Sequence, residues 1–181
     1  MKRKLIALCA VCALLFAACH SNEVAKDRDT QLQEIAQLEQ QLMMISIDES
    51  QADSLVRLYT AFVDQFADDS LSPEFLLKAG QIMTNIGQPD SSIQYYDRII
   101  DNYPDFDQLA ECYFYKAYAY EQGEHFEEAQ EAYTYFAETY PDNVLAAGLK
   151  SSVIPNLGKM GSLIEQFAND AKNQNVPIEE I

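Results

Sequence analysis

Two side-chain combinations outside the amino terminus could carry chemistry: a histidine with a nearby carboxylate, and a cysteine. His125 precedes Glu128 by three residues, so on a helix the two side chains would lie one turn apart and could supply two metal ligands. A tight metal site needs three or four converging ligands, and the sequence places no others beside this pair. Cys112 could act as a nucleophile only beside a base, and none is evident within reach. We therefore expect an exposed His125, a small buried core residue at Cys112, and no metal site.

Recognised catalytic patterns are missing from the sequence. It contains no glycine-rich phosphate loop, no nucleophile elbow and no spaced acidic pair of a recognisable type. The sequence therefore predicts a non-catalytic protein with no catalytic residues and no cofactor. An enzyme that uses His125 and Glu128 is the contrasting hypothesis, and stoichiometric metal that is lost on His125→Ala would revive it.

The amino terminus carries a different kind of chemistry, a candidate site of lipid attachment. Three basic residues at positions 2–4 precede an uncharged run of fourteen residues over 5–18, which is too short to span a membrane and typical of a secretory signal. The residues Leu-Phe-Ala-Ala-Cys at 15–19 resemble a bacterial lipobox, in which two small residues precede a cysteine that is acylated and becomes the new amino terminus. Phe16 stands where that pattern prefers leucine. The alternative is an ordinary signal peptide, cut after Ala18, with Cys19 incidental.

The lipobox resemblance implies a lipid anchor on Cys19 after removal of a signal peptide over 1–18. Lipoproteins of this kind carry three acyl chains, and since each buried CH₂ contributes about 0.8 kcal/mol, three chains hold a protein that one chain would release. His20 takes the place of the aspartate that retains some lipoproteins at the inner membrane, which implies sorting to the outer membrane. Residues 19–29 are polar and lack a helical stripe, so we interpret them as a flexible tether. We expect the body to face the periplasm, and a cell-surface orientation stays open.

The chain is strongly acidic. Its 29 acidic and 12 basic residues give a formal net charge of −17, and loss of Lys2, Arg3 and Lys4 with the signal would make this −20. Such a surface repels nucleic acid and anionic lipid headgroups, so we expect no nucleic-acid partner. Most of these carboxylates are best interpreted as a solvated surface. With Cys19 acylated, Cys112 would be left alone, and we expect no intramolecular disulfide.

One segment occurs three times at intervals of 37 residues. The copies read LYTAFVDQFAD at 58–68, YYDRIIDNYPD at 95–105 and AYTYFAETYPD at 132–142. Large apolar residues fall at i, i+3 and i+7 of each copy, which is one side of an α-helix. These residues are Tyr59, Phe62, Phe66, Tyr96, Ile99, Tyr103, Tyr133, Phe136 and Tyr140. Two copies end at Tyr-Pro-Asp, where proline bars helical φ/ψ for its predecessor, so the chain must turn there. A fixed period of this size predicts stacked helical repeats.

The sequence that follows the tether predicts an all-α domain over 30–181, with about eight helices and no strands. We expect helices over 30–47, 50–66, 72–87, 89–103, 107–123 and 124–140, then a weaker pair over 143–157 and 162–172. Pro155 should bend or end the first member of that pair early. The apolar stripe of 30–47 either packs against the next helix or forms a coiled-coil seam that oligomerises the protein, and its shortness favours packing.

Two units in the middle of the chain resemble the tetratricopeptide repeat family. The residues that carry the resemblance are Gly80, Met83, Gly87, Ser92, Tyr96, Ile99 and Pro104 in one unit, and Ala117, Tyr120, Gly123, Ala129, Tyr133, Phe136 and Pro141 in the next. The second unit matches better, with GEHFEEAQEAY at 123–133 followed by YPDN at 140–143. The period is 37 residues against the usual 34 of the family, so about three residues have entered loops or helix ends. The resemblance implies tandem helix-turn-helix repeats in an α-solenoid.

Repeats and lipobox together resemble tetratricopeptide lipoproteins of bacterial envelopes. That class includes the β-barrel assembly lipoprotein, and a periplasmic division-coordinating protein is built similarly without the lipid. The resemblance implies a non-catalytic, membrane-anchored adaptor or scaffold that binds a protein or peptide in the envelope, with outer-membrane assembly as one role. The alternative hypothesis is a structural homo-oligomer that is joined by an amino-terminal coiled coil over 30–47.

The family resemblance also implies a binding groove, because the first helix of each pair lines the concave side of such arrays. The residues on that face are Lys78, Gln81, Asn85, Tyr115, Tyr118 and Gln122. Tyrosine offers a large contact area at a low cost in rotamer entropy, which makes it a frequent interface anchor. Aromatic residues surround the helix over 107–123, however, so several of them must be core. Whether Tyr115 and Tyr118 both line the groove is left open by the sequence.

Overall fold

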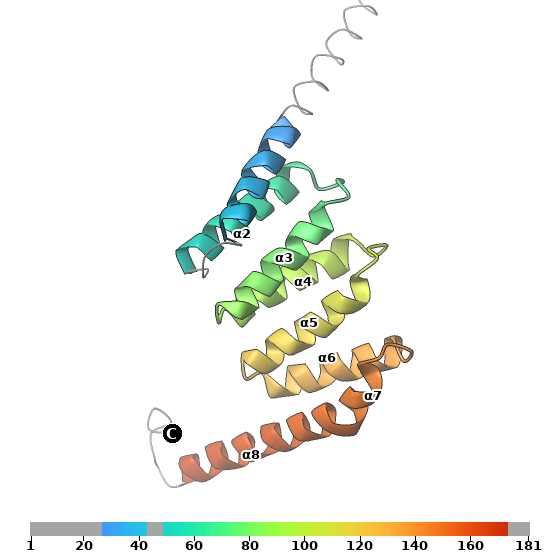
Figure 1. The fold of residues 1–181 in the computed structure, drawn as a ribbon. Coiled ribbons are helices and arrows are strands. Elements are labelled where there is room, and N and C mark those ends of the chain that lie inside the picture. Colours follow the sequence, from blue (N-terminus) through green and yellow to red (C-terminus); the bar gives the residue numbers. More distant parts are fainter. Residues whose placement is uncertain (1–26, 43–48, 174–181) are drawn as a thin grey trace, which may run out of the picture. The chain divides into compact units, whose positions relative to one another are not determined.

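The computed structural model describes residues 27–42 and 49–173 (Figure 1), and the chain divides into two compact units, Met1–Ser72 and Pro73–Ile181. Every regular element in the described ranges is a helix, which confirms the predicted all-α class. None of these helices is both long enough and apolar enough to cross a membrane. The predicted signal peptide and Cys19 lie outside the described residues. Of the predicted tether, residues 27–29 are helical, so the first helix begins earlier than the predicted residue 30.

In the first unit, the helix over residues 27–42 runs antiparallel to α2 (Glu49–Gln65). Side-chain pairs along its length fix this direction: Arg28 with Asp69 (2.6 Å), Gln31 with Gln65 (2.6 Å) and Glu39 with Tyr59 (2.6 Å). The Arg28 pair also explains the early helix start, because it holds the first turn to the end of the hairpin. Ile35 and Leu42 of the predicted apolar stripe are only 2% and 5% exposed within the single chain. This burial supports packing within the chain, the favoured of the two predicted uses of that stripe.

The second unit begins with two helical hairpins. The first joins α3 (Ser72–Asn85) to α4 (Pro89–Asn102), and the second joins α5 (Leu109–Gln122) to α6 (Phe126–Thr139), with α5 packed against both α4 and α6 (Figure 1). Within the first hairpin the helices cross closely at Gly80, where the Ser92 hydroxyl donates to the Gly80 carbonyl at 2.8 Å. The Tyr96 ring covers the same glycine. The small residue Gly80 therefore lies where α3 and α4 approach each other most closely.

The same turn closes both hairpins. A residue in the left-handed conformation follows the first helix of each, Gly87 (φ 77°) in one and Glu124 (φ 62°), 37 residues later, in the other. The next backbone N–H donates to the carbonyl five residues before it, from Gln88 to Met83 (2.8 Å) and from His125 to Tyr120 (2.9 Å). This is the Schellman arrangement, which satisfies helix carbonyls that would otherwise lack a donor.

The connections that leave α2, α4 and α6 are also alike. A backbone N–H donates to the carbonyl three residues earlier, from Asp69 to Phe66 (2.9 Å), from Phe106 to Tyr103 (3.1 Å) and from Asn143 to Tyr140 (3.0 Å). The predicted turns after Tyr103 and Tyr140 are thus confirmed. The first copy makes the same turn with Ala67 in place of proline, so the hydrogen-bonding pattern and not the proline alone defines the connection.

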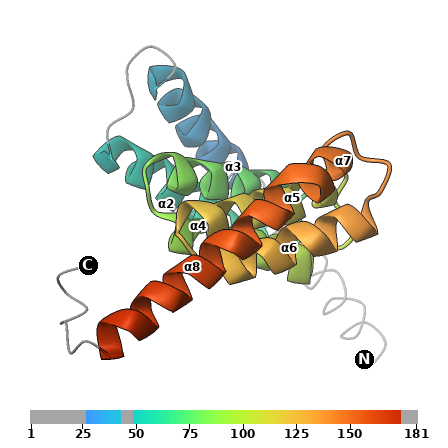
Figure 2. The same ribbon diagram turned by 90° about the horizontal axis from the view of Figure 1, so that it is seen from below.

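The carboxyl-terminal prediction of two helices, over 143–157 and 162–172, is wrong. The short α7 (Ala146–Gly148), the π-helical segment η1 (Leu149–Val153) and α8 (Ile154–Asn173) follow one another without a break. Pro155 does not end the helix, because the preceding turn is widened: Ile154 donates its N–H to the carbonyl of Leu149, five residues back. A π-helical turn of this kind accommodates a proline, which has no N–H and would clash with an α-helical carbonyl. Figure 2 shows α8 lying across the end of this unit, where it packs against α6.

Candidate functional site

His125, the residue that the contrasting enzyme hypothesis pairs with Glu128, hydrogen-bonds another carboxylate. Its Nε2 lies 2.9 Å from Oδ1 of Asp90, which is in the first turn of α4. Glu128, the predicted neighbour, instead belongs to a cavity that is described below. Among the residues that the structure describes, no group of three or more His, Cys, Asp and Glu side chains could hold a metal ion. The His125 side chain is 42% exposed, so the pair with Asp90 is a surface link between the two hairpins.

Cys112 is fully buried, as predicted for a core residue. Burial raises the pKa of its thiol to about 12, with the carboxylate of Glu111 adding to the effect. The nucleophilic form of cysteine is the thiolate, which is scarce at neutral pH when the pKa is this high. The environment of Cys112 therefore gives it no nucleophilic role.

The aromatic residues of α5 have four different surroundings. Phe114 faces the core, with its ring centroid 5.7 Å from those of Tyr133 and Phe136. Tyr115 is half-buried and stacks on Tyr96 at 6.1 Å. Tyr118 is 38% exposed. The remaining two aromatics of this helix, Tyr113 and Tyr120, turn towards α6.

The six predicted groove residues lie on α3 and α5, and they differ in exposure. Four are exposed and two are half-buried: Lys78, Asn85, Tyr118 and Gln122 in the first group, Gln81 and Tyr115 in the second. Lys78 places its amino nitrogen 5.6 Å from the ring centroid of Phe75. Because Tyr115 stacks on a core tyrosine, Tyr118 is the ring on this surface that is more available to a partner. We call the surface made by these six residues the α3–α5 face.

A second surface feature lies between α5 and α6. It is an open cavity of about 500 Å³, which we call the α5–α6 cavity, lined by Tyr113, Lys116, Tyr120, Glu128, Glu131, Ala132 and Tyr135. The Tyr113 and Tyr135 rings are 5.1 Å apart. Burial, together with the hydrogen bond to Tyr135, raises the pKa of Tyr113 to about 12, so this hydroxyl is neutral at physiological pH. The cavity thus combines phenol rings with two carboxylates and the amino group of Lys116.

Sequence reasoning missed the α5–α6 cavity, although the repeat period contains a signal for it. Shifting by 37 residues aligns Ala132 with Tyr95 and Lys116 with Ala79. The second hairpin thus has a methyl group where the first has a large ring. A comparison of side-chain size between aligned repeats could have indicated the missing volume.

Comparison with known protein families identifies two tetratricopeptide repeats in the chain, at residues 74–105 and 111–143. Each match spans one of the two hairpins, α3–α4 and α5–α6. The predicted fold class, a tetratricopeptide-like α-solenoid, is thus confirmed, and repeats of this kind are generally non-catalytic modules for binding other proteins. Neither a search of curated proteins nor a search of solved structures gave a match to this chain.

Proposed function

We propose, from the two tetratricopeptide repeats of this chain, that the protein is an adaptor that binds a partner polypeptide across the α3–α5 face. The observation that carries this proposal is the exposure of Tyr118 and Gln122 on α5. Asn85, which matches Gln122 in the preceding repeat, is also exposed, and so is Lys78 on the same helix. An exposed tyrosine ring is a frequent interface anchor, and polar side chains are typical of the rim around such an anchor. No catalytic role is proposed, because the sequence contains no recognised catalytic pattern and Cys112 is buried.

Photo-crosslinking from the α3–α5 face tests this proposal. A crosslinking amino acid at position 118 should capture a partner in intact cells, and the variant Tyr118→Ala with Asn85→Ala should lose that partner from pull-downs. Met160, which is 48% exposed on α8, provides the matched control, since Met160→Ala removes a similarly exposed side chain outside the face. If the Tyr118 and Asn85 variant recovers the same partners as the Met160 variant, the assignment of this face is wrong.

We further propose that the protein is a lipoprotein of the bacterial outer membrane, anchored through Cys19 and facing the periplasm. The support comes from the sequence: a charged start, an uncharged run of fourteen residues and a lipobox-like motif, followed by His20. An anchored adaptor would hold its partner at the membrane surface. Its role would then be that of a scaffold in the envelope, with outer-membrane assembly as one process that needs such a scaffold.

Cell fractionation tests the anchor. Wild-type protein should partition with outer-membrane markers, whereas Cys19→Ala should release it into the soluble periplasmic fraction. A Cys19→Ala protein that stays in the membrane fraction would contradict the lipid anchor. Protease added to intact cells then separates the two orientations, because a periplasmic body is protected until the outer membrane is opened.

A further inference from the structure

We propose that the α5–α6 cavity is a second binding site, which takes the basic side chain, arginine or lysine, of a partner polypeptide. Its volume of about 500 Å³ lies in the range of ligand pockets in proteins, and it is open to solvent along one side, as an inserted side chain requires. This inference does not rest on the α3–α5 face, which uses other residues of α5.

Aromatic rings line the cavity from both helices. Tyr113 and Tyr120 come from α5, and Tyr135, which is 51% exposed, comes from α6. Phenol rings attract a cation that lies over their faces, and guanidinium groups also stack on them. The cavity already shows this preference, because the amino nitrogen of Lys116 lies 5.8 Å from the ring centroid of Tyr120. A second cation can bind on the side of the cavity that Tyr135 forms.

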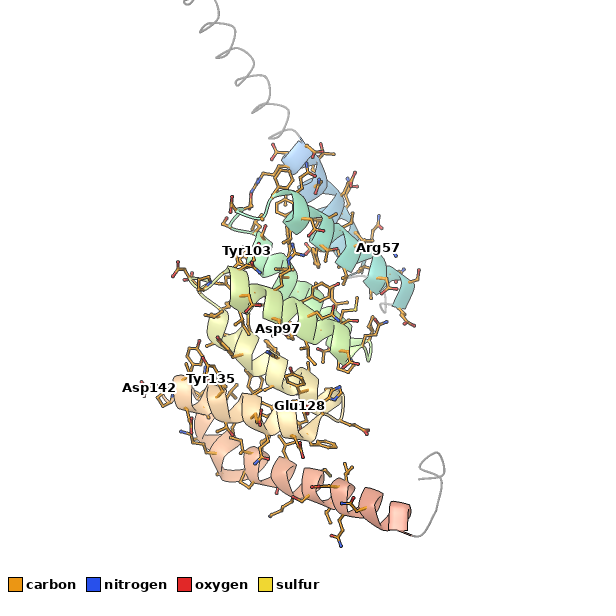
Figure 3. The ribbon with its side chains drawn as sticks, turned by 180° about the vertical axis from the view of Figure 1, so that it is seen from behind. Arg57, Asp97, Tyr103, Glu128, Tyr135 and Asp142 are labelled. Atoms are coloured by element: carbon orange, nitrogen blue, oxygen red, sulfur yellow. The ribbon has the colours of Figure 1, made fainter. Side chains whose placement is uncertain are left out.

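The charge of the cavity favours a cation over an anion. Glu128 and Glu131 stand three residues apart on α6, so their carboxylates lie on one face of that helix. Lys116 is the cavity's own cation, and Asp97 of α4 already neutralises it at 2.5 Å. The lining therefore keeps two uncompensated negative charges. Figure 3 shows Glu128 and Tyr135 along α6, and Asp97 on α4.

The lining of the cavity differs from the matching part of the first hairpin at several positions, among them Ala132 for Tyr95 and Lys116 for Ala79. Ala132 occupies the place that Tyr95 takes 37 residues earlier, and its small side chain leaves the space between α5 and α6 unfilled. Ala132 is half-buried in the wall of the cavity, so a larger ring at this position should occupy the cavity. Ala132→Tyr should therefore fill it, and circular dichroism checks that the variant keeps its helical fold.

Binding of short peptides to the purified full-length protein tests the proposal. The probe is an alanine peptide with one central arginine and blocked ends, and the controls carry citrulline or glutamate in its place. Isothermal titration or tyrosine fluorescence should show saturable binding of the arginine peptide, and binding should weaken by about tenfold when neutral citrulline removes the charge. The glutamate peptide should not bind.

Three variants connect that binding to the cavity. Ala132→Tyr should abolish binding, and Glu128→Gln with Glu131→Gln should weaken it by about tenfold, because the cation–π and charge contributions act together. Glu138→Gln with Glu165→Gln, which removes two exposed carboxylates outside the cavity, should leave it unchanged. Absence of saturable binding to wild type, equal binding of the citrulline peptide, or wild-type affinity in the glutamine variant would each overturn the inference. If Ala132→Tyr fails to fold, the glutamine variant still decides.

Discussion

Replacement of Gly80 by alanine tests the packing of the first hairpin at its closest point. A β-carbon added at Gly80 would lie 2.6 Å from Cε1 and 2.7 Å from Cζ of the Tyr96 ring. Carbon atoms of a packed interior do not approach within 3 Å, so either the ring or the helix must move. The ring has little freedom, because Tyr96 is completely buried and stacks on Tyr115.

Two opposing contributions set the size of the effect. Alanine is the better helix former in a helix interior, which would stabilise the variant by up to about 1 kcal/mol. Overpacking of a close-packed core typically costs about 1–3 kcal/mol. Since Tyr96 is confined, we expect the clash to win and Gly80→Ala to lose about 1–2 kcal/mol of unfolding free energy.

Urea unfolding followed by circular dichroism measures this loss, and Gly148→Ala provides the matched control. An added β-carbon at Gly148, in α7, meets nothing within 4 Å, so the helix preference should act alone and stabilise the protein by up to about 1 kcal/mol. The two substitutions should thus have opposite signs. A Gly80→Ala variant as stable as wild type would refute the reasoning. Ala117 and Tyr133 are the matching residues of the second repeat, so this result would show that Tyr96 can adopt a position like that of Tyr133.

Four further substitutions test other local features. Glu124→Gly should raise the unfolding free energy by up to about 1 kcal/mol by relieving the left-handed backbone, and Gly87→Ala should lower it similarly in the same urea assay. Arg28 hydrogen-bonds the carboxylate of Asp69 and lowers its pKa. Asp69→Asn should therefore lower the free energy of unfolding by about 0.5–1 kcal/mol at neutral pH. This difference between wild type and variant should vanish in acid, because the wild-type carboxylate is then protonated. Burial raises the pKa of Tyr96 to about 12. Wild-type stability should therefore fall as the pH rises above the ordinary tyrosine pKa of about 10. Thermal melts across alkaline pH should show a weaker dependence of stability on pH for Tyr96→Phe.

Much of the fold could be predicted because its causes are local. The apolar spacing within each 37-residue unit gave the helices α2 to α6 to within a few residues, and the Tyr-Pro-Asp segments gave the turns that follow α4 and α6. The carboxyl-terminal helix was wrong for an equally local reason. Proline was expected to end a helix, whereas the π-helical turn before Pro155 lets the helix continue. Such a turn has no sequence signature as strong as that of proline itself.

The candidate sites show where local information ends. Composition led us to expect no nucleic-acid partner, and this stays a prediction. On α5, however, aromatic residues occur on every side, so helical periodicity carries no information about which ring faces the core. Tertiary packing decided that Phe114 and Tyr115 contact core rings while Tyr118 is exposed, because those contacts depend on α4 and α6. The α5–α6 cavity likewise depends on space that Ala132 leaves between two helices, and the sequence of one helix cannot show a void that only a neighbouring helix encloses.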